Sequence, residues 1–364
     1  MPTHDRALEA KLLNFSRALI DQEKARVIVP PERAESGYWF GGGNLAMDPE
    51  GTLWLTGRYR SAGDSRTGLD LGDRGRELAI FRSLDRGRSW KKVLGLGKED
   101  LRASGREVLS IEGSALRFRD GQVELFVSSE KRLPYPEPVS AFMKPGTGVW
   151  TIERMVASSV EGLAGSGIET VLESHDPGTL HVKDPFLYDS PSGTSFLFFC
   201  HHPFIWSSSN SGFAVLDGST VGSPDFSFLP RGRTWDVAIS RATCILDLPR
   251  LGHLADTPPI SLVFYDGGEC LRRHDEHAAA AKRRRGHSCE ELGGVGYFSG
   301  GDFAAVERLS PLFPAFESPW GSGSSRYVDV LHAAEGFYAT WQQAQKDCSQ
   351  ALVMNFMPMD EALG

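Results

Sequence analysis

The chain has 364 residues, of which 40% are hydrophobic and 24% are charged, and its formal net charge is −8. This composition is typical of a globular protein with a large core. The acidic balance argues against nucleic acid or an anionic membrane as the main partner. The basic run at 282–285 lies among loop residues and is interpreted as a solvated loop.

The first 27 residues, MPTHDRALEAKLLNFSRALIDQEKARV, predict an amphipathic helix without the apolar block and cleavage site of a signal peptide. No apolar stretch approaches the roughly 18 residues that a membrane span needs. The five cysteines are an odd number without a disulfide spacing, which fits reduced thiols. We therefore expect a cytoplasmic protein with no membrane partner.

One pattern then recurs five times: an apolar strand, a turn with glycine, a second apolar strand, and one or two looser strands. The units begin near Gly43, Ile111, Asp184, Asp236 and Ser325. Their spacing of roughly 50–75 residues suits four-stranded propeller blades. We predict an all-β fold, a five-bladed β-propeller with a short N-terminal helix, and keep a β-sandwich as the alternative. Residues 1–34 would form the helix and lead-in, and residues 35–360 the catalytic propeller domain.

Within the first unit, the stretch SLDRGRSW at 83–90 resembles the Asp box, S-x-D-x-G-x-[ST]-W, of sialidase-type propellers. The resemblance implies that Asp85 and Gly87 shape a tight turn between outer strands and that Trp90 packs between blades. This role is structural, so Asp85 is not a catalytic candidate.

The second unit opens with IEGSALRFRDGQVELF at 111–126, where two apolar runs flank Asp120-Gly121. This pattern predicts a β-hairpin. Glu112 stands at its mouth, where a strand gains nothing from a carboxylate. It is either a solvated strand end or a residue that the hairpin presents to a ligand.

In a propeller, the innermost strand of every blade lines a central channel, and one mouth of that channel is the usual pocket. Polar residues near the start of each first strand should therefore converge. These residues are Asn44, Glu112, Asp184, Arg241 or Thr243, Arg326, Tyr327 and Asp329.

The stretch KDPFLYD at 183–189 is similar to the Asp-Pro strand of five-bladed glycosidases of the arabinanase/xylosidase type. The hairpin at Glu112 resembles the strand that carries the general acid in that group. Those enzymes use a Glu as acid, one Asp as base and another Asp to tune the pKa of the acid. The resemblance implies that Glu112 is the acid and Asp184 the tuning or basic carboxylate.

The chain departs from that group in two places. The group has its carboxylates in the order Asp, Asp, Glu, whereas Glu112 precedes Asp184 here. The first blade carries Asn44 where the base Asp of the group would stand. Asp329 or Asp236 would then have to supply the missing carboxylate.

Glycoside hydrolysis needs one protonated carboxyl and one ionised carboxylate, and burial at a channel mouth separates their pKa values. We expect Asn44, His181, Arg241, Arg326, Tyr327 and Asp329 to contact the substrate. The two arginines would suit the carboxylate of a uronate. Each residue also has a structural alternative: a turn for Asp184, interblade ion pairs for the arginines, and core packing for His181 and Tyr327.

The sequence therefore predicts a glycoside hydrolase that cleaves an oligosaccharide containing uronate or pentose units, with no cofactor. One alternative is a polysaccharide lyase, in which a Tyr or His abstracts a proton from a uronate. The other is a non-catalytic carbohydrate-binding propeller. The oligomeric state is left open.

The segment 266–291 interrupts the fourth unit. Cys270, His274, His277, His287 and Cys289 have spacings that could hold a metal, but their pattern is not a standard zinc signature. A charged loop is the favoured interpretation, and no metal is expected. The position of the segment would also let it cover the pocket, with Glu290 or Glu291 reaching inward.

Overall fold

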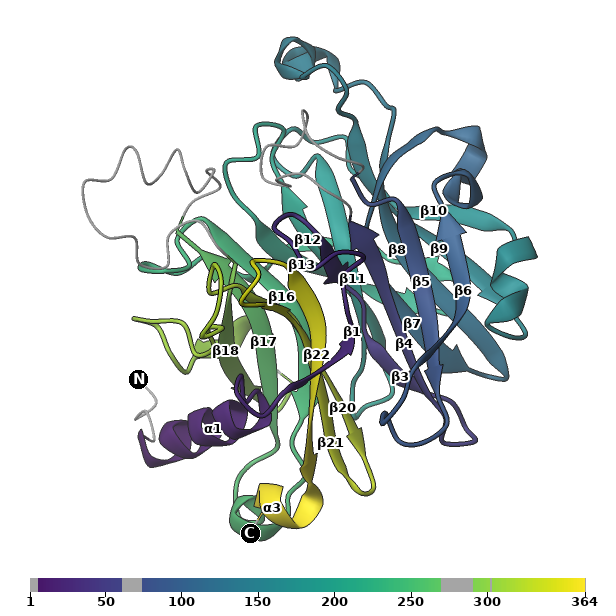
Figure 1. Ribbon diagram of the computed structural model, residues 1–364. Coiled ribbons are helices and arrows are strands. Elements are labelled where there is room, and N and C mark those ends of the chain that lie inside the picture. The colour runs from purple at the N-terminus through teal and green to yellow at the C-terminus, as the bar shows by residue number, and fades with distance from the viewer. Residues whose placement is uncertain (1–5, 61–73, 270–290, 302, 364) are drawn as a thin grey trace.

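The computed structural model describes residues 6–60, 74–269, 291–301 and 303–363. Their strands form a five-bladed β-propeller with one N-terminal helix, as the repeats predict (Figure 1). The described helices are α1 (Arg6–Leu19), α3 (Met359–Leu363) and the short 3₁₀ helices η2 (Glu99–Leu101), η3 (Ala103–Gly105), η4 (Glu137–Phe142), η5 (Glu161–Gly165), η6 (Gly252–Leu254) and η7 (Phe303–Ala305). In these ranges no helix is both long and apolar enough to cross a membrane.

The blades follow one another along the chain, each built from antiparallel strands. Blade 1 contains β2 (Trp39–Gly41), β3 (Leu45–Met47), β4 (Leu53–Arg60), β5 (Glu77–Ser83) and β6 (Lys91–Gly97). Blade 2 contains β7 (Val108–Arg119), β8 (Gln122–Lys131), β9 (Val149–Ala157) and β10 (Ile168–Leu172). Blade 3 contains β11 (His181–Asp189), β12 (Ser195–His202), β13 (Asn210–Asp217), β14 (Thr220–Val221) and β15 (Asp225–Leu229). Blade 4 contains β16 (Ile239–Asp247), β17 (Ile260–Gly268), β18 (Leu292–Ser299) and β19 (Glu307–Arg308).

Blade 5 joins the two ends of the chain. It contains β20 (Ser325–Ala333), β21 (Gly336–Ala344), β22 (Gln350–Pro358) and, as its outer strand, β1 (Arg26–Val29) from the N-terminal segment. β2 also pairs with β22, in parallel. The first and last blades therefore share hydrogen bonds, which closes the ring. The pairing strand β1 lies within the segment that the sequence assigns to the lead-in.

The core lies between the blades and not on the axis. Five apolar clusters fill the five interfaces between neighbouring blades. The helix α1 contributes to the cluster between blades 4 and 5 with Leu12, Phe15 and Leu19. Figure 1 shows α1 on the outside of the molecule, beside the strands of blade 4. The apolar side chains therefore pack between the blades, and polar side chains lie at the axis.

The predicted hairpin turns are present. Asp120 and Gly121 both have positive φ, 51° and 72°, between β7 and β8, as a two-residue turn of this type requires. In the turn after β5, the Asp85 carboxylate accepts hydrogen bonds from Ser83, from the backbone of Ser89 and from its hydroxyl, and the Trp90 indole donates to Gly87 O at 3.1 Å. These contacts are local, so Asp85 serves the turn.

An irregularity recurs at one level of the innermost strands. In β7, Glu112 and Gly113 together face one residue of β8. In β11, Asp184 and Pro185 together face one residue of β12. The same excess of one residue occurs at Thr243 in β16, at Tyr327 and Val328 in β20, and between β2 and β3 in blade 1. Such β-bulges redirect side chains, and here they redirect them toward the axis.

The packing of β1 as the outer strand of blade 5 can be tested with two valines of the same strand. Val29 is 2% exposed in the cluster between blades 5 and 1, whereas Val27 is 47% exposed. Val29→Asp buries a charge without a partner, so we expect a loss of roughly 3 kcal/mol or more in the free energy of unfolding. Val27→Asp should change it by less than about 1 kcal/mol. Urea titrations that give equal losses would show that β1 is not packed into the cluster between blades 5 and 1.

Candidate active site

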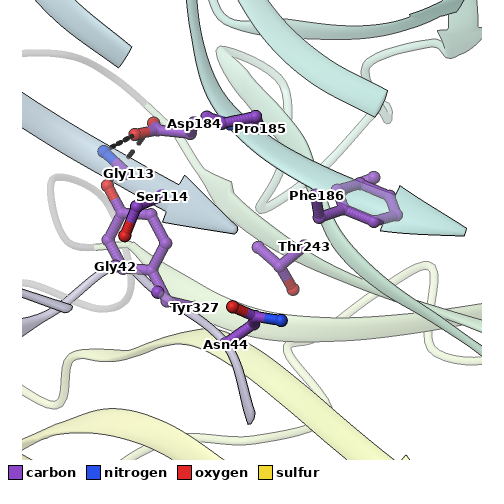
Figure 2. A pocket seen from close by; sticks show the side chains of 11 residues that line it. Gly42, Asn44, Gly113, Ser114, Asp184, Pro185, Phe186, Thr243 and Tyr327 are labelled. Atoms are coloured by element: carbon purple, nitrogen blue, oxygen red, sulfur yellow. Dashed lines mark hydrogen bonds between the residues drawn. The ribbon is translucent and has the colours of Figure 1, made fainter. Parts of the chain in front are cut away.

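A small cavity lies on the axis, where all five blades meet (Figure 2). Its volume is about 20 Å³, which holds about one water molecule. It is lined by Gly42, Gly43, Asn44, Gly113, Ser114, Asp184, Pro185, Phe186, Ala242, Thr243 and Tyr327. The bulges therefore bring together residues that are as much as 285 positions apart, Gly42 and Tyr327, around one point.

Asp184 is the most heavily contacted carboxylate of this site. Its Oδ1 accepts from Gly113 N at 3.0 Å, and its Oδ2 accepts from Arg241 at 3.2 Å and from the Tyr327 hydroxyl at 3.4 Å. Burial opposes the charge, but the nearby Lys183 and Arg241 outweigh it and hold the pKa of Asp184 far below its usual value. Asp184 is therefore ionised at neutral pH.

Asp184 also has a positive φ of 53°, which is unusual for a residue other than glycine. The Ser128 hydroxyl stabilises this conformation from blade 2, because it accepts from Asp184 N at 3.0 Å and donates to Gly113 O at 3.1 Å. A Cβ on Gly113 would lie 2.8 Å from the Asp184 backbone, so only glycine permits this approach of the two bulges.

Glu112 is 6% exposed and is bound by two arginines of β4. Arg58 donates to its Oε2 at 2.5 Å, and Arg60 lies 3.8 Å from its Oε1. Burial favours the neutral carboxyl, but Arg58 and Lys183 outweigh burial and hold the pKa of Glu112 below 4.5. Glu112 is thus also ionised in the free protein, which is not the resting state of a general acid.

Tyr327 and Arg241 are held by a second buried carboxylate, Asp266. Tyr327, at φ 53°, donates its backbone N–H to Asp266 at 3.0 Å, and the Arg241 guanidinium donates to the same carboxylate at 2.7 Å. Arg241 also pairs with Glu291 at 2.8 Å and stacks on the Tyr327 ring. Burial raises the pKa of Asp266 to about 6 and that of Tyr327 to about 12. The guanidinium of Arg241 is therefore fully engaged inside the protein.

Asn44 links blades 1 and 2. Its amide nitrogen donates to Leu116 O at 3.0 Å, and its amide oxygen accepts from Leu116 N at 2.8 Å. A carboxylate could not donate to Leu116 O. The amide at this position therefore satisfies a strand edge, which is a physical reason for Asn here where the arabinanase-type enzymes carry Asp.

The two carboxylates considered as substitutes for that Asp differ in position. Asp329 accepts from Leu45 N at 2.7 Å beside Asn44, and burial raises its pKa to about 6. Asp236 is fully buried and bound to Arg308 and Tyr265, away from the residues that line the cavity. Of the two, Asp329 is thus the one close to the axis.

The remaining candidates are His181 and Arg326. Like Glu112, Arg241 and Asp329, they are not among the residues that line the cavity. His181 is buried, stacks on Trp206, and lies 3.3 Å from the Tyr135 hydroxyl; burial lowers its pKa to about 3.

Arg326 pairs with Glu291 and stacks on Trp39 at 4.1 Å. Glu291 therefore reaches inward, as one interpretation of the segment 266–291 expects. The roles of His181 and Arg326 as substrate contacts stay predictions.

Sequence reasoning missed Trp39, Arg58, Arg60, Lys183 and Asp266. Arg58 and Arg60 alternate along β4, and Asp266 ends an apolar run on β17; all three lie on second strands. A charged residue in an otherwise apolar second strand was the available signal, because its burial requires a partner of opposite charge. The signal does not show where that partner lies, since Glu124 on β8 pairs with Arg117 and Arg154 away from the axis.

No group of three metal-binding side chains is found among the described residues. The metal candidates of the sequence, Cys270 to Cys289, lie outside them.

Comparisons with known proteins support the fold. No family model matches the chain, and no curated protein does. Among solved structures, a thermostable family-43 glycoside hydrolase has a TM-score of 0.58 at 10% identity, over 90% of this chain and 92% of that one. An α-L-arabinofuranosidase from Lactobacillus brevis has a TM-score of 0.56 at 10% identity, over 90% and 91%. A GH43_1 enzyme from Xanthomonas citri has a TM-score of 0.55 at 9% identity, over 98% and 96%. The fold is that of the five-bladed propeller glycosidases that the sequence motifs resemble.

The raised pKa of Asp329 makes a testable prediction about stability. A carboxyl with a folded pKa of about 6 and an ordinary value of 3.8 favours the folded state at low pH, and this contribution is lost as the pH rises through 6. Asp329→Asn removes the buried charge and keeps an acceptor for Leu45 N. We expect the variant to exceed the native protein in unfolding free energy by about 1–3 kcal/mol at pH 8 and by less at pH 4.

Denaturant titrations at several pH values measure this difference. Asp217→Asn, at an exposed position on β13, serves as the control and should show no such trend. An Asp329→Asn difference that does not grow between pH 4 and pH 8 would contradict the assigned burial of this charge.

Proposed function

We propose that the protein is a glycoside hydrolase that cleaves an oligosaccharide at the axial site, with Glu112 and Asp184 as its catalytic carboxylates. The observation that carries the proposal is the placement of these two side chains on adjacent bulges. Gly113, the neighbour of Glu112, donates directly to Asp184. Two carboxylates near one point are what glycosidic bond cleavage requires. The likeness in fold to family-43 glycoside hydrolases supports the same function.

The two carboxylates are not equivalent. Asp184 accepts from a backbone N–H, a guanidinium and a phenol, whereas the main partner of Glu112 is Arg58. Glu112 therefore takes up a proton more readily once a substrate draws Arg58 away or screens it. We assign Glu112 the role of proton donor and Asp184 that of the carboxylate that stays ionised. Tyr327, whose hydroxyl donates to Asp184 and accepts from Arg58, would contact the sugar.

One observation favours a second candidate, a non-catalytic saccharide-binding propeller. Both candidate carboxylates, Glu112 and Asp184, are ion-paired, with pKa values below their usual range. The lyase alternative requires a Tyr or a His as base. The pKa of Tyr327, about 12, disfavours it in that role, and His181 lies outside the cavity lining with a pKa that burial lowers to about 3. Turnover decides between hydrolase and binding protein.

The catalytic assignment is tested by Glu112→Gln and Asp184→Asn. If these groups act in acid–base chemistry, each variant should lose about 10²- to 10⁴-fold in kcat/KM on aryl glycosides of pentoses, hexoses or uronates. Glu124→Gln is a matched control, because Glu124 is buried and paired with Arg117 and Arg154 elsewhere in blade 2. Equal losses in all three would indicate destabilisation. No turnover by the native protein, together with saccharide binding, would favour the binding protein.

The role of Glu112 as donor predicts an acid pH optimum. Because its pKa in the free protein lies below 4.5, the donating form disappears as the pH rises, and kcat/KM should fall by about tenfold per unit above that value. Arg58→Gln removes the principal cation and should move this descending limb to higher pH. A kcat/KM that rises or stays level between pH 5 and 7 would show that Glu112 acts in its ionised form.

A further inference from the structure

The charged side chains around the axis form one connected cluster that is not neutral. Ion pairs, with the Tyr327 hydroxyl as a bridge, connect five cations and four carboxylates in the described part of the chain. The cations are Arg58, Arg60, Lys183, Arg241 and Arg326, and the carboxylates are Glu112, Asp184, Asp266 and Glu291. The adjacent pair of Arg74 and Glu130 adds no net charge. Within these ion pairs the cations exceed the carboxylates by one in a largely buried place, which is costly without an anion. Asp329, the other buried carboxylate near the axis, accepts from Leu45 N and forms no ion pair with any of these five cations.

The excess charge lies on Arg60. Its one ion-pair partner in the described ranges is Glu112, 3.8 Å away, and that carboxylate is already bound by Arg58 at 2.5 Å. Arg58 also donates to Gly41 O and the Tyr327 hydroxyl, and Arg241 donates to three carboxylates. No comparable hydrogen bond is made by the Arg60 guanidinium to any described residue.

The electrostatics agree with this position of the excess charge. Burial lowers the pKa of Arg60 to about 10, and repulsion from Arg58, Arg74 and Arg326 acts in the same direction, against Glu112. A nearby anion would relieve all of these effects.

Trp39 organises this part of the site. It pairs with Arg60 across β2 and β4, and the Arg60 guanidinium lies over its ring at 4.8 Å, while that of Arg326 from blade 5 lies at 4.1 Å. The three side chains are 5–8% exposed. Guanidinium donors lie in the plane of the group, so stacking on an aromatic ring does not occupy the N–H edge. The edge of Arg326 is engaged by Glu291 and by the Gln342 amide, whereas Arg60 has Glu112 as its one ion-pair partner in the described ranges.

We propose that Arg60, stacked on the Trp39 ring beside Arg326, forms a subsite for the carboxylate of a uronate-type sugar. A carboxylate is planar and matches the donor fork of a guanidinium. As a monoanion it would neutralise the single excess charge, whereas a dianionic phosphate ester would leave the cluster with excess negative charge. The proposal rests on the proposed function only in that a saccharide carries the anion. It differs from the sequence expectation, because Arg60 takes the place of Arg241 and Arg326, whose donors are engaged inside the protein.

Calorimetric binding to the full-length protein tests the subsite directly. The probes are glucuronate and galacturonate, the neutral sugars glucose and galactose, and glucose 6-sulfate and glucose 6-phosphate. We expect both uronates to bind at least roughly tenfold more tightly than the neutral sugars, since a hydrogen bond to a charged group contributes that much. Equal affinity for uronates and neutral sugars would overturn the proposal. Tighter binding of either ester than of the uronates would overturn the assignment to a carboxylate.

Three variants locate the effect. Arg60→Gln should abolish the preference for uronates, and Arg60→Lys, which keeps the charge but not the fork, should retain part of it. Arg106→Gln is the control, because Arg106 pairs with Glu173 away from the axis, and it should leave the preference unchanged. A preference that survives Arg60→Gln would refute the subsite.

A measurement on the native protein covers the case in which Arg60→Gln does not fold. Glucuronate should raise its melting temperature and glucose at the same concentration should not, because only a ligand of the folded state stabilises it. Equal shifts would overturn the proposal. Failure of the hydrolase assignment is a separate result: uronate binding without turnover leaves the subsite in place, and turnover of neutral glycosides without uronate binding removes the subsite alone.

Discussion

The structure depends on one extra residue in the innermost strand of every blade. A bulge leaves backbone groups without partners in their own sheet, and a buried group of this kind has to be satisfied elsewhere. Here the neighbouring blade supplies the partner: Asp184 for Gly113 N, Asp329 for Leu45 N, and Asp266 for Tyr327 N. The bulges thus fix the blades to one another and at the same time direct carboxylates to the axis, so stability and the candidate site depend on the same bonds.

This arrangement explains why the axis carries so many charges. Carboxylates that accept backbone N–H groups are buried, and each needs a cation to remain ionised at low cost. Arg241 serves Asp184, Asp266 and Glu291 together, and Arg58 serves Glu112. Arg241 is thus shared among three carboxylates, and Glu112 is shared between two arginines. The positive and negative charges are therefore not matched one to one. The uncompensated charge at Arg60 is a consequence of this sharing, and it makes the cluster receptive to an anion.

The sequence contains most of the fold and about half of the site. Alternating apolar runs and the Asp120-Gly121 turn predict the hairpins, since both signals are local. Glu112, Asp184 and Tyr327 could be found because they interrupt apolar first strands. Arg58, Arg60 and Asp266 were missed because they lie on second strands. The sequence does not show which residue of another strand faces a charge at such a position. The ionisation of Glu112 was equally out of reach, because Arg58, from another blade, determines it.

The low identity to proteins of the same fold follows from where the core lies. Apolar clusters between blades need only volume and hydrophobicity, which many sequences supply, so the propeller persists at about 10% identity. Axial residues are constrained by chemistry instead. At the first blade, the amide of Asn44 satisfies both backbone groups of Leu116, and an aspartate would give up the bond to Leu116 O. A change at that position therefore alters the interblade bond and the charge of the axis together. The protonation state of Glu112 likewise depends on its burial and on the nearby charges of Arg58 and Lys183, which the fold alone does not determine.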